Sequence, residues 1–237
     1  MKNDLLYNGF LLLLLLFLNP MSSSAQPYLI QSKEGYSNVR EDANAKSKVL
    51  DQLKNNTIVL IDQVEEQDLE NEQWFKVLYY ENLPFSIVEV SIEKQLKTGY
   101  IHKSQLKAVN TLGKPAKNEF SMEYSLRKFS LKDKKIDYMD ESSASIKSIN
   151  GIYYYLGDCG IPKEEIYKTE AKINGKKLVI PSKLYLGIIS ATNNFEYFKV
   201  GKVYLAVQEI GDGACANHVV WVFEKDMLSQ RFVGWEF

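Results

Sequence analysis

Residues 167–180 read YKTEAKINGKKLVI and contain the strongest turn signal in the chain, Asn174-Gly175. Asn174 and Gly175 separate two runs with β character, residues 167–173 and 177–180. Both residue types tolerate positive φ, which a two-residue type I′ turn requires at both central positions. The stretch therefore predicts a tight antiparallel hairpin.

Further β-type runs surround this hairpin at near-regular spacing. With the two arms of the hairpin, the candidate strands are residues 152–156, 167–173, 177–180, 184–189, 195–200, 203–210, 218–223 and 231–235. The run Val219-Val220-Trp221-Val222-Phe223 is apolar at every position, which is typical of a strand inside the core rather than at a sheet edge. Short strands separated by turns predict an antiparallel β-sandwich or barrel over residues 148–237. We recognise no family motif in this half.

The N-terminal half shows short β-type runs with little helical period. They are residues 28–30, 49–53, 57–62, 74–80, 85–90 and 99–101. Asn55-Asn56 predicts a hairpin turn between the second and third of these runs, because Asn tolerates positive φ. Closely spaced strands of three to six residues favour a small barrel, which removes free sheet edges by curling the sheet on itself. The whole chain is thus expected to be mostly β, with a small barrel followed by the sandwich or barrel.

The order of motifs in this half resembles the bacterial SH3-like (SH3b) domain. That family has an N-V-R opening, a small-residue loop, a hydrophobic hairpin, a W-x-x-V strand and a closing G-W/Y-[VI] strand. The matching segments here are Ser37-Asn38-Val39-Arg40, Lys48-Val49-Leu50, Trp74-Phe75-Lys76-Val77, and Gly99-Tyr100-Ile101-His102 closing on Leu106. The likeness covers about 80 residues, a third of the chain. The connection between Val77 and Gly99 is longer than the family pattern needs.

The resemblance implies an extracytoplasmic binding module, with peptidoglycan peptides as the usual suspected ligand, but a barrel implies no chemistry by itself. Trp74 and Tyr100 are the aromatic residues expected near a peptide groove, because planar amphipathic rings give large contact area. Arg40 has the donors to pair with a ligand carboxylate. The alternatives are that Trp74 fills the barrel core and that Arg40 is a solvated residue at the start of a loop. His102 is expected on the surface or in the groove.

Gly113 and Pro115 break the β pattern just after the last motif of the barrel, so we place a boundary there. The predicted organisation is a signal peptide over residues 1–25, the SH3-like barrel over 26–110 and the β-rich domain over 148–237. Residues 111–147 form a connector between the last two, and the sequence does not indicate its structure.

The N-terminus has the layout of an export signal. Lys2 precedes an unbroken apolar run over residues 10–18, and small residues follow, with Ser23 and Ala25 at positions −3 and −1 of a cut after Ala25. Nine helical residues rise about 14 Å, less than half of a bilayer core, so a stable span is not expected after cleavage. The sequence predicts an exported protein, periplasmic or secreted.

The composition of the chain excludes several classes of partner and cofactor. The formal net charge is −1, from 29 basic and 30 acidic residues. A charge this small gives no strong electrostatic attraction for nucleic acid or anionic lipid, so neither is expected as a partner. The chain has two histidines and two cysteines, which are too few ligands for a typical Cys/His metal centre. No cofactor is expected. In an oxidising compartment, Cys159 and Cys215 are expected to form one disulfide that staples the C-terminal half.

Both cysteines lie in glycine-rich loops that also carry an aspartate. If the disulfide forms, it brings Asp158, Asp212, Asn217 and His218 toward one end of the sheet. Oxygen ligands gathered there suit a divalent cation. However, the spacing matches no calcium loop, and glycine with aspartate is ordinary turn chemistry, so no metal site is predicted.

Three functions follow for comparison. The first is a non-enzymatic exported protein that binds cell-envelope material, such as a cell-wall peptide or an envelope protein. The second is an interaction or inhibitor protein that docks a secreted hydrolase through its C-terminal aromatic residues Trp221, Phe232, Trp235 and Phe237. The third is a papain-like cell-wall peptidase with Cys159 as nucleophile and His218 as base, and a disulfide would disable it because a bonded sulfur is no thiolate.

Overall fold

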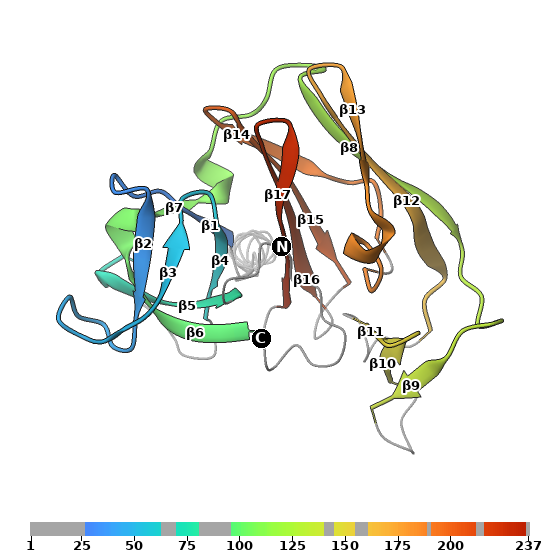
Figure 1. Ribbon diagram of the computed structural model, residues 1–237, viewed down its shortest axis with the longest axis horizontal. Coiled ribbons are helices and arrows are strands. Elements are labelled where there is room, and N and C mark those ends of the chain that lie inside the picture. Colours follow the sequence, from blue (N-terminus) through green and yellow to red (C-terminus); the bar gives the residue numbers. More distant parts are fainter. Residues whose placement is uncertain are drawn as a thin grey trace, which may run out of the picture.

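A computed structural model describes residues 27–62, 70–80, 96–139, 145–154, 161–188, 191–211 and 216–235. The expected mostly β fold with antiparallel sheets is confirmed: the described residues form strands joined by turns and three-residue 3₁₀ segments. Figure 1 shows the sheets side by side, with the N-terminal sheet at one end, a four-stranded sheet in the middle and a three-stranded sheet at the other end. The predicted signal peptide lies outside the described residues. Within the part described here, no helix is long and apolar enough to cross a membrane.

Seven strands form the N-terminal sheet. They are β1 (Pro27–Ile30), β2 (Tyr36–Arg40), β3 (Val49–Lys54), β4 (Ile58–Ile61), β5 (Trp74–Tyr80), β6 (Leu96–His102) and β7 (Leu106–Ala108), in the sheet order β3-β2-β6-β5-β4-β1-β7. All pairs are antiparallel. The 3₁₀ segments η2 (Lys103–Gln105) and η3 (Val109–Thr111) flank β7. The predicted strand at residues 85–90 lies outside the described residues.

Alternating side chains of this sheet fill a core of their own. The cluster contains Ile30, Val39, Leu53, Val59, Ile61, Phe75, Val77, Tyr79 and Ile101. On β5, Phe75, Val77 and Tyr79 occupy alternate positions, as the period of two in a strand requires. β4 is buried at all four positions, because its other face is covered by the C-terminal half.

Three sheets form the C-terminal half. The four-stranded sheet contains β14 (Glu196–Val200), β15 (Val203–Ile210), β16 (Asn217–Glu224) and β17 (Met227–Trp235), in sequence order. One three-stranded sheet is β13 (Lys176–Ile180), β12 (Glu164–Ile173) and β8 (Phe120–Lys128); the other is β11 (Ile152–Tyr153), β10 (Ile146–Ile149) and β9 (Ile136–Tyr138). The connector of residues 111–147, whose structure the sequence left open, therefore supplies β8 to a sheet of the C-terminal half.

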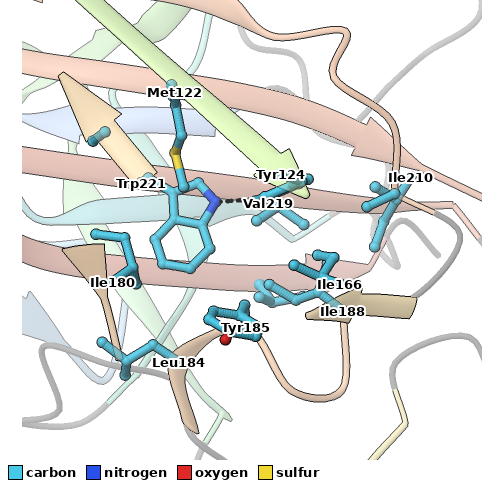
Figure 2. Close-up of a cluster of buried hydrophobic side chains, with 14 of the residues drawn as sticks. Met122, Tyr124, Ile166, Ile180, Leu184, Tyr185, Ile188, Ile210, Val219 and Trp221 are labelled. Atoms are coloured by element: carbon cyan, nitrogen blue, oxygen red, sulfur yellow. Dashed lines mark hydrogen bonds between the residues drawn. The ribbon is translucent and has the colours of Figure 1, made fainter. Parts of the chain in front are cut away.

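The four-stranded sheet is buried on both faces, and β16 shows why the sequence there is apolar throughout. Val219, Trp221 and Phe223 point toward the sheet of β8, β12 and β13, whereas Val220 and Val222 point toward the N-terminal sheet. The prediction that this run lies inside the core is confirmed. In Figure 2, the Trp221 indole lies among Met122, Tyr124, Ile180 and other apolar side chains of the first interface.

The second interface joins the two halves of the chain. From the N-terminal sheet it includes Leu29, Ile58, Leu60, Leu78 and Tyr80, and from the four-stranded sheet Phe198, Leu205, Val220, Val222 and Phe232. Two buried hydrogen bonds cross it: the backbone N–H of Ile58 donates to Gln230 Oε1 at 2.8 Å, and Tyr80 Oη donates to the Val233 carbonyl at 2.6 Å. The halves are therefore packed through a continuous core.

The turn predictions had mixed outcomes. Asn174 and Gly175 have φ of 49° and 81° and join β12 to β13, so the type I′ hairpin is confirmed. The Asn55-Asn56 turn forms, but the predicted hairpin is wrong, because β3 pairs with β2 whereas β4 pairs with β1 and β5.

The predicted strand at residues 184–189 is also wrong. The 3₁₀ segment η5 (Ser182–Leu184) and a turn occupy this place, and Gly187 has φ of 88°. Leu184, Tyr185 and Ile188 are buried in the core beside Trp221 (Figure 2), so the apolar run reflects a turn that closes one end of the core.

Candidate functional site

The residues singled out in the N-terminal half meet on the outer face of three neighbouring strands. Arg40 on β2 lies opposite Tyr100 on β6, and His102 on β6 lies opposite Trp74 on β5. Residues opposite each other in a ladder point to the same face of the sheet. The neighbours Val39, Phe75 and Ile101 are in the core, so these four side chains point outward.

A groove of about 290 Å³ lies on this face. Its lining residues are Glu34, Asn38, Arg40, Ala45, Trp74, His102 and Gln105. Arg40 and Trp74 are thus brought together in one cavity, and His102 is in the groove. Tyr100 is half-buried beside Arg40 but is not among the lining residues. We call this cavity the outer groove.

Gly99 lets β2 approach β6 at this point. A Cβ added to Gly99 would lie 2.4 Å from Val39 Cγ1 and 3.0 Å from the Arg40 carbonyl oxygen, and neither contact is tolerated without movement. The glycine of the closing strand is therefore required by packing, and the close approach sets Arg40 beside Tyr100.

Arg40 has a structural contact and donors to spare. Its Nη1 donates to the Ser47 carbonyl at 2.7 Å, which holds the loop between β2 and β3 against the groove. A guanidinium carries five N–H donors in a planar fork, so this bond leaves further donors for a carboxylate or a carbonyl. Arg40 thus anchors the loop that follows it, a contact that neither role considered from the sequence includes, and it keeps donors for an anion.

Trp74 is half-buried and stands at the groove rather than in the core of the sheet. Its indole makes an edge-to-face contact with the His102 imidazole, with centroids 5.2 Å apart and an interplanar angle of 83°. Such pairs prefer this arrangement because the positive edge of one ring meets the negative face of the other. The two rings therefore support each other and together form one side of the outer groove.

The tautomer of His102 follows from its contacts at the start of η2. His102 Nδ1 accepts from the backbone N–H of Ser104 at 3.3 Å and lies 2.8 Å from Ser104 Oγ. A backbone N–H can only donate, so Nδ1 is the acceptor and a neutral imidazole carries its proton on Nε2. The ring thus offers an N–H donor on the side away from the turn.

Four lining residues were missed by the sequence analysis: Glu34, Asn38, Ala45 and Gln105. Asn38 could have been found, because it lies two positions before Arg40 on the same strand and so on the same face. Gln105 accepts from the Ser37 hydroxyl at 2.5 Å, and Glu34 lies in the turn before β2. Only the fold brings these two segments to the groove, so no local pattern marks them.

The predicted sites of the C-terminal half are only partly described. Cys159 and Cys215, with Asp158 and Asp212, lie outside the described residues, so the disulfide, the cation site and the Cys/His pair stay predictions. Asn217 and His218 are both buried at the start of β16, and His218 lines a separate cavity at the seam between the halves. Over the described parts of the chain, no group of three His, Cys, Asp or Glu residues could hold a metal ion.

Two of the four C-terminal aromatic residues proposed as interface anchors lie in the core. Trp221 and Phe232 are both fully buried, Trp221 against the β8 sheet and Phe232 against the N-terminal sheet. Trp221 Nε1 donates to Tyr124 Oη at 2.8 Å, drawn in Figure 2. For these two residues the docking prediction is wrong, because they fill interior layers. The side chain of Trp235, and Phe237, lie outside the described residues.

A perturbed carboxylate ties the connector to the four-stranded sheet, away from the outer groove. Glu119 accepts hydrogen bonds from Lys199 Nζ, from the Ala116 backbone N–H at 2.8 Å and from Tyr204 Oη at 2.8 Å. These donors, led by Lys199, lower the pKa of Glu119 from 4.5 to about 2. The same contact raises the pKa of Lys199. This arrangement is a structural ion pair.

No protein-family model matches the chain, and searches of curated proteins and of solved structures find no similar protein.

Proposed function

We propose that this is a non-enzymatic exported protein that binds cell-envelope material, with peptidoglycan peptides as the first candidates. In this proposal the N-terminal sheet is an SH3-like barrel and the outer groove is its binding site. The observation that carries the proposal is the convergence of Arg40, Trp74 and His102 on one open face.

The chemistry of the groove favours a peptide with a carboxylate. Arg40 and the Nε2–H of His102 supply donors, and the Trp74 ring supplies a rigid apolar surface with an indole N–H. Arg pairs with carboxylates through parallel N–H bonds, and aromatic rings gain contact area with little loss of side-chain entropy. Glu34 at the same groove suits an ammonium or amide on the other side of the ligand.

Calorimetry with soluble peptidoglycan stem peptides, and pull-down with purified sacculi, test the proposal. We expect binding at micromolar to high-micromolar concentration. Trp74→Ala should weaken it about tenfold or more, and Arg40→Gln about tenfold, because each removes a central contact. Matched controls are Tyr167→Ala, an exposed aromatic residue on β12, and Arg127→Gln, an exposed arginine on β8.

The controls should bind as the unchanged protein does. Absence of binding at high micromolar concentration, in both assays, would remove the cell-wall version of the proposal. Equal binding by Trp74→Ala and Tyr167→Ala would remove the outer groove as the site.

The non-enzymatic part of the proposal depends on the state of the two cysteines. With Cys159 and Cys215 joined, no thiolate is available for nucleophilic catalysis. Thiol titration of the exported protein, unfolded without reductant, should give no free thiol. A titratable thiol in the folded protein, reacting faster than a small-molecule thiol, would favour the Cys159/His218 peptidase instead.

A further inference from the structure

A polar pocket lies where the turn between β3 and β4 meets the hairpin of β16 and β17. Its volume is about 330 Å³, at the lower end of the range for ligand pockets. The N-terminal half contributes residues 52–57 and Tyr80 to its lining, and the C-terminal half contributes Glu224, Ser229 and Gln230. We call it the amide pocket. Among the described residues, none lines both this pocket and the outer groove.

The lining of the amide pocket is polar almost throughout. Four of its side chains are amides and three carry a hydroxyl: Gln52, Asn55, Asn56 and Gln230, and Thr57, Tyr80 and Ser229. Lys54 and Glu224 contribute one charge of each sign, and Leu53 is the one aliphatic side chain among the described lining residues. Pockets for drug-sized molecules are lined mainly by apolar and aromatic side chains. This pocket therefore suits a ligand that is neutral overall and makes several hydrogen bonds.

Gln230 is held in the pocket by a hydrogen bond between the two halves. It is 6% exposed, and its Oε1 accepts from the backbone N–H of Ile58 at 2.8 Å. A backbone N–H can only donate, so this bond fixes which end of the side-chain amide faces Ile58. The other end, Nε2, donates to no described residue, yet it is not enclosed by protein atoms. The two N–H groups of Nε2 are therefore donors already in position for a ligand in the pocket.

Further donors and acceptors line the pocket with Gln230. Asn56 Oδ1 accepts from Gln31 Nε2 at 2.7 Å, which leaves the Nδ2 group of Asn56 to donate. Ser229 Oγ donates to a backbone carbonyl at 3.0 Å and can still accept. Glu224 is half-buried at the end of β16, and its carboxylate forms no ion pair within the described parts of the chain. Amide donors and oxygen acceptors are thus combined in one small pocket.

We propose that the amide pocket binds a neutral sugar residue of a glycan. Each sugar hydroxyl both donates and accepts, so the hydroxyls of one ring match a lining that offers donors and acceptors together. Nε2 of Gln230 and Nδ2 of Asn56 donate to oxygens of the sugar, and the Glu224 carboxylate accepts from one of its hydroxyls. A peptide segment is a poorer match, because its side-chain carbons would meet little apolar surface beyond Leu53. This site is separate from the outer groove, and the proposal does not depend on peptide binding there.

Titration of the purified protein with single sugars tests this proposal. The neutral probes are N-acetylglucosamine, glucose and galactose, and the charged probes are glucosamine and glucuronate. Tetrahydropyran-2-methanol has the same ring with a single hydroxyl and serves as the hydroxyl-poor control. Binding is followed by the chemical shifts of the Gln230 side-chain NH₂ group and of the backbone amides. We expect at least one neutral sugar to give saturable shifts at Gln230 and Glu224 at millimolar concentration, and the control to give none.

Two variants test the contacts. Gln230→Glu keeps an acceptor for the Ile58 N–H but removes both Nε2 donors, so it should weaken sugar binding about tenfold. Glu224→Gln should weaken it about threefold, because an amide oxygen is a weaker acceptor than a carboxylate. Its matched control is Glu123→Gln, an exposed carboxylate on β8, which should bind as the unchanged protein does. If thermal unfolding shows that Gln230→Glu does not fold, Glu224→Gln carries the test, since Glu224 lies at the surface end of β16.

Other outcomes overturn the proposal. Binding confined to glucuronate would make the pocket an anion site at Lys54, and binding confined to glucosamine would make it an amine site at Glu224. Equal binding of tetrahydropyran-2-methanol would contradict recognition through hydroxyls. Shifts at the Trp74 indole in place of Gln230 would assign the sugar to the outer groove. No saturable shift with any neutral sugar up to about 20 mM would leave the pocket without this ligand. The assay contains no peptide, so its result is independent of whether the outer groove binds one.

Discussion

The outer faces of β5 and β6 have two ends with opposite character. At one end, Trp74 and His102 stand half-buried at the outer groove. At the other end of the same face, Leu78 and Tyr80 are buried against the four-stranded sheet, and Leu96 packs beside them. One pair of strands thus carries an open aromatic and polar surface and a covered apolar one, and the change of side-chain type marks where the interface between the halves stops.

The second half of the chain therefore covers the apolar part of the N-terminal sheet. Leu60, Leu78 and Tyr80 would be exposed in an isolated N-terminal half. Among the described residues of this face, the uncovered end is where we propose that the peptide ligand binds. The following predictions test the two ends separately, in order of decreasing effect.

Loss of a core side chain at the covered end should have the largest effect. Leu60 is fully buried between the halves, so Leu60→Ala should lower the free energy of unfolding by about 2–5 kcal/mol. Urea unfolding followed by circular dichroism measures this. The wild-type protein should unfold in one transition; a separate early transition for either half would contradict a shared core.

A methyl group at Gly99 should be the next largest change. Gly99→Ala forces a Cβ against Val39 and the Arg40 backbone, and such overpacking costs about 1–3 kcal/mol. Because the strain falls where β2 meets β6, ligand affinity at the outer groove should drop as well. Gly151→Ala is an informative comparison, since no atom lies near its Cβ position but its φ is positive. It should lower stability without changing affinity.

Removal of one buried hydroxyl should have a smaller effect at the covered end. Tyr80→Phe removes the hydrogen bond to the Val233 carbonyl, and a typical intramolecular hydrogen bond contributes about 0.5–1.5 kcal/mol. Thermal unfolding detects the loss, and binding at the outer groove should not change. A change in affinity equal to that of Trp74→Ala would mean that the two ends are not separate.

The smallest effect is expected at Glu119, which lies at neither end. Its pKa is about 2 in the folded protein and 4.5 in the unfolded chain, so its ion pair stabilises the fold fully above about pH 4.5. This contribution is lost as the pH falls from 4.5 toward 2. Stability of Glu119→Gln should depend less on pH in that window, as acid unfolding would show, and ligand affinity at neutral pH should not change.

Much of the fold could be predicted from local patterns, and the failures have physical causes. The Asn174-Gly175 hairpin follows from the φ values that both positions need. Residues 184–189 were predicted as a strand because apolar side chains indicate burial, but a buried turn at the end of a core is as apolar as a strand. The Asn55-Asn56 turn formed as predicted, but the pairing of the strands beside it is set by the whole sheet.

The candidate site residues were likewise predictable only in part. Arg40 and Trp74 could be named from their motifs, and both line the outer groove. Trp221 and Phe232 were taken for surface anchors because composition does not show that the four-stranded sheet is covered on both faces. The amide pocket could not be predicted, since its lining joins residues 52–57 to residues of β5, β16 and β17 that share no local pattern.

The most direct test of the account is a titration of the protein with soluble peptidoglycan stem peptides, observed at the indole N–H of Trp74 and at the amides of Leu60 and Leu78. We predict a saturable shift at Trp74 with the two leucines unchanged. Shifts only at the covered end or in the amide pocket, or none at millimolar peptide, would contradict the assignment of peptide binding to the open end.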